Sequence, residues 1–318
     1  MNLFSKIMIA SLAIITFSCD KENDTNASSK TPTAAITTAT PKKFLFDATK
    51  AETAGNADWV LDADSSPQRF PTPAQSNVTA TTTESFWRGA LSAWGIALAK
   101  LGHSVETLPS GTAITYGGTG AQDLKNYDVF VVDEPNIRFT AAEKTAILNF
   151  VKNGGGLFMI SDHTVSDRNN DGWDSPAIWN DLMSTNTVQT NPFGITITLN
   201  NFSETTSNRL SATTNPILNG SQGIVTNLKY SAGASMSINT TANATAQGLI
   251  WRASSSQGTS NIMCASATFG TGRVFVIGDS SPADDGTGAT GDTLYPGWTE
   301  LASHSRLHMN ASLWLAKL

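Results

Sequence analysis

Cysteine is nearly absent from this chain of 318 residues, which has only Cys19 and Cys264. A disulfide framework is therefore excluded beyond one pairing of these two, and stability has to come from a buried core. Positive charge is also scarce, because 20 Lys and Arg face 26 Asp and Glu and lie scattered along the chain. We expect no nucleic-acid partner, since binding of that kind needs clustered positive charge.

The N-terminus has the pattern of an exported protein. Lys6 precedes an apolar run from Ile7 to Phe17 that is too short to span a bilayer as a mature helix, which is typical of a signal peptide. The run ends at Thr16-Phe17-Ser18-Cys19, which resembles the lipobox of bacterial lipoproteins, although that family usually has Leu where Thr16 stands. The resemblance implies cleavage after residue 18 and diacylation of Cys19. The alternative is ordinary signal cleavage nearby, with Cys19 lost or free.

The same resemblance predicts where the protein resides. Asp20 to Asp24 is similar to the acidic segment that follows the lipidated Cys in surface-exposed lipoproteins. We therefore expect an outer-membrane lipoprotein, periplasmic or exposed on the cell surface, held at the membrane by its lipid anchor only. Residues 19–43 lack apolar periodicity and predict a disordered tether. Residues 44–318 predict one folded domain.

The clearest structural pattern lies at residues 129–160. Val129 to Val132 is a short apolar strand, and Thr140 and Glu143 have the spacing of a capping box that begins a helix. Glycines at 154–156 end this helix, and Leu157 to Ile160 is a second apolar strand. The pattern predicts a βαβ unit whose strands both end at one edge of a parallel sheet, where α/β proteins bind their ligands.

Further apolar patterns predict the rest of the domain. We expect strands at 44–46, 105–108, 262–268 and 273–277, helices at 84–101, 175–183 and 298–315, and several short strands within 185–260. The segment 185–260 is therefore predicted to be a β-rich insertion. For the helix at 175–183 we expect Ser175 as the N-cap and Pro176 in the first turn.

Several motifs together resemble the class I glutamine amidotransferase-like superfamily, and most of all its ThuA-like, non-amidotransferase branch. They are DVFVVDEPN, TAAEKTAILNFVKNGGGLFMISD, NPILNG and GTGRVFVIGDSS. The resemblance implies a flavodoxin-like three-layer α/β sandwich with a mostly parallel sheet. True amidotransferases carry a nucleophilic Cys on the turn after a strand, where this chain has Ser161-Asp162-His163. Hydrolysis of glutamine by a thiolate is therefore not expected, and Cys264, inside a strand pattern, is expected to be a core thiol.

Polar side chains follow the predicted strands at the sheet edge. Carboxylates gathered there repel one another unless a cation or a proton neutralises them, so they predict a divalent-metal site or an acid/base pair. The alternative is that they only cap helices and loops. We expect Asp162, His163, Asp279 and His304 to be catalytic, and the substrate-binding candidates are Asp47, Glu52, Asn56, Asp133, Glu134, Asn136 and Ser280.

A second candidate metal site lies at 167–174. Asp167, Asn169, Asp171 and Gly172 match the opening of a calcium loop, with Asp174 as a further candidate ligand. Ile178 stands where an EF-hand has its bidentate Glu, so the match is partial. The alternative is a turn rich in Asp, Asn and Gly that binds no metal. Calcium is the cation we expect here, and no nucleotide cofactor is expected.

These patterns lead to two functional hypotheses. The first is a lipid-anchored extracytoplasmic hydrolase that uses carboxylates and His163 or His304, with or without a divalent metal, on an extracellular glycan, related polymer or small molecule. The second is a non-catalytic surface lipoprotein of the same fold that binds a glycan or partner. Trp59, Trp173 and Trp298 flank the polar loops and either stack on sugar rings or pack in the core.

Overall fold

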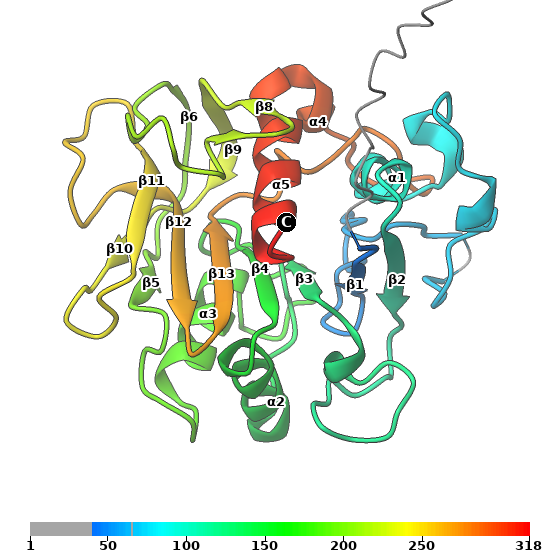
Figure 1. The fold of residues 1–318 in the computed structure, drawn as a ribbon, viewed down its shortest axis with the longest axis horizontal. Coiled ribbons are helices and arrows are strands. Elements are labelled where there is room, and N and C mark those ends of the chain that lie inside the picture. The colour runs from blue at the N-terminus through cyan, green and yellow to red at the C-terminus, as the bar shows by residue number, and fades with distance from the viewer. Residues whose placement is uncertain (1–39, 65) are drawn as a thin grey trace, which may run out of the picture. The chain divides into compact units, whose positions relative to one another are not determined.

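A sheet of nine strands crosses the part of the chain that the computed structural model describes, residues 40–64 and 66–318 (Figure 1). The order is β2-β1-β3-β4-β13-β12-β10-β5, and β11 also pairs with β12. The strands of this sheet are β1 (Lys43–Asp47), β2 (Ser104–Leu108), β3 (Val129–Asp133), β4 (Gly156–Ile160), β5 (Ile195–Ile197), β10 (Met236–Ile238), β11 (Gln247–Trp251), β12 (Ile262–Phe269) and β13 (Gly272–Ile277). The expected signal peptide, Cys19 and the tether up to residue 39 lie outside the described residues.

The strands β2, β1, β3, β4 and β13 pair in parallel, whereas β12, β11, β10 and β5 extend the sheet with antiparallel pairs. The parallel part has the flavodoxin-like order, in which the chain moves first outward from β1 to β2 and then to the other side at β3. The expected α/β fold class is confirmed. The crevice between β1 and β3 is the point where such sheets bind ligands.

Helices cover both faces of the sheet. They are α1 (Ser92–Lys100), α2 (Ala141–Lys152), α3 (Ser175–Ser184), α4 (Gly297–Glu300) and α5 (Ala302–Leu315). The pleat assigns the strand residues alternately to two cores: Phe46, Val131 and Ile160 pack towards α1 and α5, whereas Leu45, Val132 and Met159 pack towards α2 and α3. This arrangement gives the three layers.

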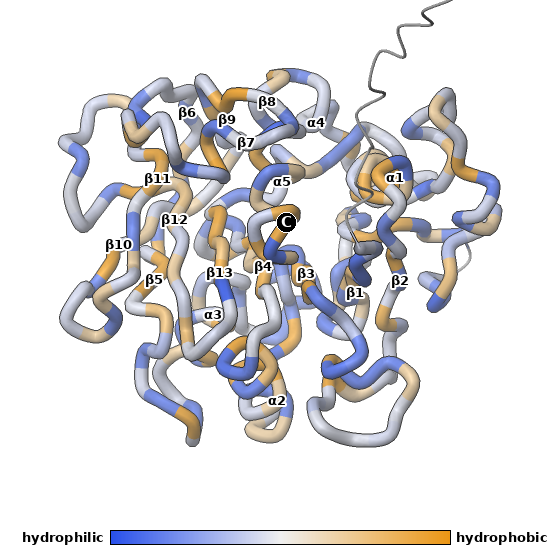
Figure 2. Tube along the Cα trace, in the orientation of Figure 1, coloured by the Kyte–Doolittle hydropathy of each residue, from blue (hydrophilic) through white to orange (hydrophobic). Residues whose placement is uncertain are grey.

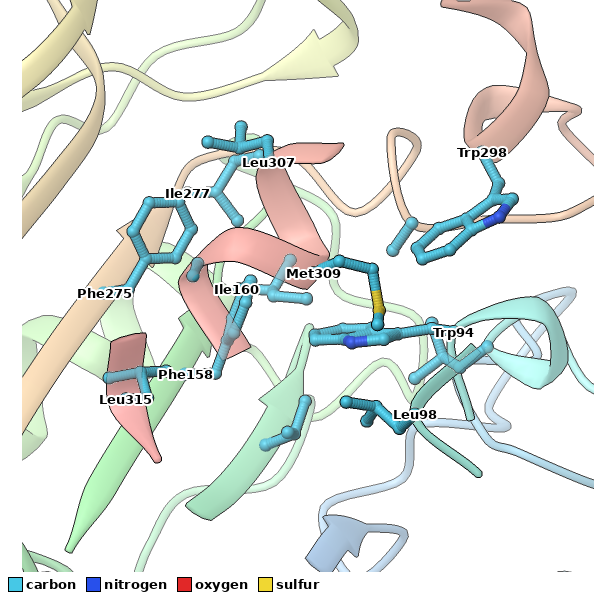
Figure 3. Close-up of a cluster of buried hydrophobic side chains, with 14 of the residues drawn as sticks. Trp94, Leu98, Phe158, Ile160, Phe275, Ile277, Trp298, Leu307, Met309 and Leu315 are labelled. Carbon is cyan, nitrogen blue, oxygen red and sulfur yellow. The ribbon is translucent and has the colours of Figure 1, made fainter. Parts of the chain in front are cut away.

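The core under α1 and α5 is aromatic (Figure 3). Trp94 of α1 packs edge-on against Phe158 of β4 with ring centroids 4.7 Å apart, and Phe158 packs in the same way against Phe275 of β13 at 4.8 Å. Apolar residues recur along β4 and β13 (Figure 2). Cys264 is fully buried in the same core, and burial raises the pKa of its thiol, which agrees with an inert core residue.

Two expected helices differ from the structure. The helix expected from Glu84 begins only at Ser92, because residues 88–91 pair with the segment 58–63, with Leu91 N–H donating to Val60 O at 3.0 Å. Gly89 lies so close to that segment that a Cβ would be 2.2 Å from Val60 O. The expected last helix is divided into α4 and α5 by Leu301, whose backbone is extended.

The helix starts of α2 and α3 are set by their capping residues. Thr140 and Glu143 form the expected capping box at α2. At α3 the N-cap is Asp174, whose carboxylate accepts the Ala177 N–H, so the expectation that Ser175 is the N-cap was wrong. The carboxylate of an Asp caps a helix as well as a Ser hydroxyl, and Pro at the following position fits either choice.

The segment 185–260 is rich in strands. Besides β5, β10 and β11 it forms a two-stranded sheet from β6 (Phe202–Thr206) and β9 (Leu228–Gly233), and a hairpin from β7 (Asn219–Gly220) and β8 (Gly223–Ile224). None of the helices in the described part of the chain combines the length and the apolar character needed to cross a bilayer.

Candidate functional site

Acidic side chains gather where the parallel strands end. Asp133 is the last residue of β3 and shares the face of Val131, and Asp162 and Asp279 follow two residues after Ile160 and Ile277, which are on that face. Asp47 instead shares the face of Leu45 and pairs in register with Leu108, which belongs to the opposite core. The pleat therefore brings three of the four strand-end Asp residues together and turns Asp47 away.

Asp47 forms a separate pair with Glu52, and both side chains are buried. Burial raises the pKa of Asp47 to about 6, and burial together with the Asp47 charge raises the pKa of Glu52 well above its usual value. Glu52 also accepts the Lys50 N–H at 2.7 Å, and the Lys50 side chain donates to Glu143 of α2 at 2.7 Å. The pair therefore belongs to the layer of α2.

Glu134 is the centre of the other cluster. It is fully buried directly after β3, with a φ of 43° that places its backbone in the left-handed region, which is strained for a side-chain-bearing residue. Arg168 donates to both of its carboxylate oxygens, from Nε to Oε1 and from Nη2 to Oε2 at 3.1 Å. Ser280 donates to Oε2 at 3.0 Å and Ser166 to Oε1 at 2.5 Å. Glu134 is thus a carboxylate held by four donors.

Asn136 and Asn56 fix this cluster at the switch point of the sheet. The Asn136 backbone N–H donates to Lys50 O at 2.7 Å, which joins the loops after β1 and β3, and its side-chain oxygen accepts the Arg168 N–H at 2.9 Å. Arg168 also donates to the Asn56 side chain at 3.0 Å. The candidates Asn56, Glu134 and Asn136 are therefore brought together beyond the carboxyl ends of β1 and β3.

Arg168 and Ser166 were missed by the sequence analysis. Arg168 lies 5.7 Å over the ring of Trp59 and its side chain is 20% exposed, so it separates the buried carboxylates from solvent. One signal could have identified it, because Arg168 is the only Lys or Arg between Lys152 and Arg209. A single cation within a loop of carboxylates is expected to pair with them.

Asp162 and His163 lie beside Glu134. Asp162 Oδ2 is 2.9 Å from Ser166 Oγ, and burial and the nearby charge of Glu134 raise its pKa well above the usual value. His163 Nδ1 donates to Thr164 O at 2.7 Å, and this bond fixes the tautomer with the lone pair on Nε2. That Nε2 lies 3.8 Å from Asp162 Oδ2, and the side chain is 22% exposed. His163 therefore connects a buried acid to solvent.

Asp279 and Asp133 complete the acidic cluster. Asp279 accepts the backbone N–H groups of Ser231 and of Ser281, the latter at 2.8 Å, and burial raises its pKa to about 6. Both carboxyl oxygens of Asp133 are buried without a hydrogen-bond partner in the described part of the chain. Burial and the Glu134 charge raise its pKa well above its usual value, so this environment favours the neutral form of Asp133.

His304 does not join this cluster. Its Nδ1 donates to Gly297 O at 2.7 Å and its Nε2 accepts the Lys229 N–H at 3.1 Å, so backbone groups occupy both ring nitrogens. The ring is buried at one wall of a cavity of about 100 Å³, which Ser231, Ser281 and Tyr295 also line. The geometry gives His304 no nitrogen with which to accept a substrate proton.

In the loop at 167–174, the carboxylates accept hydrogen bonds from backbone N–H groups of the same loop. Asp167 accepts the N–H groups of Asp171 and Gly172 at 3.0 and 2.7 Å, and Asp171 accepts the Trp173 N–H at 2.9 Å. The Asp174 carboxylate caps the start of α3 by accepting the Ala177 N–H. The Asn169 side chain donates to the Asp171 carboxylate and to Asn136 O. Across residues 40–64 and 66–318, no three His, Cys, Asp or Glu side chains are placed to hold a metal ion. The loop fits a turn in this conformation.

The Trp residues do not form an exposed platform. Trp59 and Trp298 are buried, and the guanidinium of Arg138 lies 3.9 Å over the ring of the half-buried Trp173. The hypothesis that these rings stack on sugars is therefore corrected for Trp59 and Trp298. Their large apolar surfaces are more stable inside the protein than in water.

The fold and site place the chain among α/β proteins with a flavodoxin-like sheet. A scan against known protein families finds no match, and neither does a search of curated proteins. Solved structures with a similar fold include the mmIFT52 N-terminal domain, which covers 86% of this chain and 97% of its own with a TM-score of 0.49 and 14% identity.

ThuA-like proteins are also among these structures. One from Parabacteroides merdae covers 87% of this chain and 90% of its own, with a TM-score of 0.38 and 10% identity. One from Bacteroides uniformis covers 87% and 93%, with a TM-score of 0.39 and 12% identity. Likenesses of this size concern the fold alone and carry no argument about activity.

Proposed function

We propose that the protein is an extracytoplasmic hydrolase in which His163 and Asp162 act as an acid/base pair. The observation that carries the proposal is the partly exposed His163 ring, whose tautomer is fixed by Thr164 O and whose Nε2 lies 3.8 Å from the buried acid Asp162. His163 can take a proton from an attacking water, and Asp162 holds a proton that it can supply to a leaving group.

The charges around the site favour a neutral substrate. Glu134 and Asp279 lie near Asp162 of this pair, and Arg168 already donates to Glu134, Asp162 and Asn56. No cation of the cluster is left to receive an anionic group. An extracellular glycan without acidic sugars, or a related polymer or small molecule, is therefore the substrate class that we propose.

The experiment is turnover by the full-length protein on a panel of neutral and acidic glycans and simple esters, measured by release of reducing ends or acid. We expect cleavage of a neutral substrate. The result against the proposal is the absence of turnover on every member of the panel together with binding of one of them.

That contrary result would favour a second candidate, a non-catalytic surface protein that binds a glycan or partner at this edge. The observation in its favour is the exposed apolar rim beside the site, where the side chain of Val165 is 80% exposed and that of Leu199 is 61% exposed. Thr164 N–H donates to Asn200 O at 3.1 Å, so the two side chains belong to adjoining segments. A binding protein uses such apolar surface without any need for the buried acid.

We also propose that the chain is a lipoprotein with Cys19 as its acylated residue and that it belongs to the ThuA-like branch of the class I glutamine amidotransferase-like superfamily. The lipobox-like sequence and the strand and turn motifs support these two proposals. Metabolic labelling with a palmitate analogue tests the first, and Cys19→Ala is expected to lose the label. Protease treatment of intact cells separates surface display, which gives digestion, from a periplasmic location, which gives protection.

Calcium binding at 167–174 stays a separate proposal, supported by the spacing of Asp167, Asn169 and Asp171. Binding would require these side chains to leave the backbone N–H groups that they accept. Calorimetry with Ca²⁺ is expected to give a binding isotherm for the wild type and none for Asp171→Ala. Flat traces for both proteins would remove the site.

A further inference from the structure

The hydroxyl of Ser166 lies between two carboxyl groups. Its Oγ is 2.5 Å from Glu134 Oε1 and 2.9 Å from Asp162 Oδ2, and both distances are hydrogen-bond distances. A hydroxyl has one hydrogen to donate, so it cannot donate to both oxygens at once. The second bond forms only when one of the two carboxyl groups carries a proton and donates it to Ser166.

The surrounding donors decide which carboxyl group carries that proton. Glu134 receives two hydrogen bonds from Arg168 and one from Ser280, which favours its ionised form. Asp162 receives only one distant contact from Arg168, at 3.4 Å. The proton is therefore on Asp162, which donates to Ser166, and Ser166 donates in turn to Glu134.

We propose that Ser166 is a positioning residue that works as a hydrogen-bond switch between Glu134 and Asp162. While Asp162 is protonated, the Ser166 hydrogen points to Glu134. When Asp162 loses its proton, the hydroxyl turns and donates to the new carboxylate, while Arg168 and Ser280 still hold Glu134. No bond between heavy atoms forms or breaks. The proton that leaves the Asp162 carboxyl binds to His163 Nε2 or to the leaving group.

This inference rests on the proposed acid/base role of Asp162 and His163, and it adds how the buried Asp162 can ionise at all. The groups that face Asp162 are Glu134 after β3, Asp279 after β13, and Arg168 and His163 from its own loop. The two carboxylates oppose its ionisation, and Arg168 favours it. The Ser166 hydroxyl is the donor that is able to change partner, and its bond to Asp162 lowers the pKa of that carboxyl against the effect of burial.

The test reads the protonation of Asp162 without a substrate. The infrared carbonyl band of protonated carboxyl groups is followed against pH in the full-length protein, and Asp162→Asn assigns the contribution of Asp162. Ser166→Ala is expected to move the midpoint of that band upward by about one pH unit, because the hydrogen bond lost from the ionised Asp162 is stronger than the one lost from its protonated form. Ser166→Thr keeps the hydroxyl and is expected to restore the wild-type midpoint.

Ser280→Ala is the matched control, because Ser280 also donates to Glu134 and makes no hydrogen bond to Asp162. It is expected to leave the midpoint in place. If Ser166→Ala does not fold, Ser166→Cys replaces it, since a thiol is a weaker donor and moves the midpoint in the same direction.

Two results would overturn the proposal: an unchanged midpoint in Ser166→Ala, or the absence of any protonated band that Asp162→Asn removes. The proposed function is tested separately, by turnover on the glycan panel. Turnover with an ionised Asp162 would overturn the switch and the acid role of Asp162, and would leave the hydrolase activity itself. A shifted midpoint without turnover would support the switch and remove the hydrolase.

Discussion

Two pairs of buried acids lie at the same edge of the sheet and differ in what surrounds them. Asp47 and Glu52 after β1 face the layer of α2, where Lys50 and Glu143 form a closed ion pair. Glu134 and Asp162 after β3 and β4 face the other way and are connected by Ser166, Arg168 and the partly exposed His163. The second pair thus has a partly exposed, titratable side chain beside it, which can pass a proton to solvent.

The difference teaches that an acid at a strand end is not by itself a candidate for catalysis. Successive residues of a strand face opposite sides of the sheet. A shift of one residue along the strand therefore reverses the side that the acid faces. Asp47 shares the face of Leu45, whereas Asp133 shares that of Val131.

Replacement of His163 should have the largest effect. In a hydrolase with the proposed mechanism, His163→Ala is expected to lower turnover by about 10²- to 10⁴-fold, which is the usual contribution of general base catalysis. Glu52→Gln is the control from the other pair, because the amide imitates a neutral acid. Equal losses in both variants, measured on the same substrate, would end the distinction between the pairs.

Removal of the cation of the second pair should cost stability. Arg168→Met leaves the fully buried Glu134 without its charge partner, and we expect the free energy of unfolding to fall by about 3–5 kcal/mol. Lys42→Met removes a partly exposed ion pair with Asp128 and is expected to cost less than about 1 kcal/mol. Urea unfolding at neutral pH measures both. A cost for Arg168→Met as small as that of Lys42→Met would show that the cluster does not depend on this cation.

The first pair should be visible in the pH dependence of stability. Burial raises the pKa of Asp47 to about 6, so the folded protein keeps a proton that the unfolded chain has lost. Asp47 should therefore contribute a fall in the free energy of unfolding as the pH rises from about 4 to about 6 and no further change above that range.

Asp47→Asn is expected to remove this contribution and so to lessen the fall, because an amide does not titrate. Urea unfolding over the range from about pH 4 to about pH 7 compares it with the wild type and with Asp128→Asn, a surface control. A slope in Asp47→Asn equal to that of the other two proteins would contradict the assignment of a raised pKa to Asp47.

The smallest effect is expected in the loop after β4, which carries Asp162 of the second pair. Val165 is 80% exposed and has a φ of 61°, a conformation that a β-branched residue resists. Val165→Gly relieves this strain at some cost in chain entropy, so a net gain of up to about 1 kcal/mol in the free energy of unfolding is expected. Leu199→Gly, at an exposed position without positive φ, should destabilise. A loss in both variants would show that Val165 is not strained.

The sequence predicted the sheet better than the site. Val129 to Val132 and Leu157 to Ile160 are apolar because both faces of their strands are buried, and the capping box fixed the start of α2. Burial, in contrast, depends on the layers that cover a residue. Trp59 and Trp298 have polar neighbours in sequence, yet both rings are buried.

The site was predicted only in part, because it also depends on how distant parts of the chain pack together. Strand-end position identified Glu134 and Asp162, but it also identified Asp47, because the face of a strand-end residue depends on the register between strands. The pairing of Arg168 with Glu134 joins residues from different loops, and no local spacing signals it. His304 was expected to be catalytic, but the backbone groups of Gly297 and Lys229 occupy both of its ring nitrogens.

The place of β13 in the sheet has a consequence for the newly made chain. β13 pairs with β4, although all of the strands from β5 to β12 lie between them in sequence. Until β13 is in place, the edge of β4 that it covers has unpaired N–H and C=O groups beside apolar side chains. An open edge of that kind attracts other chains. A chain cut short before residue 272 is therefore expected to aggregate more readily than the whole chain.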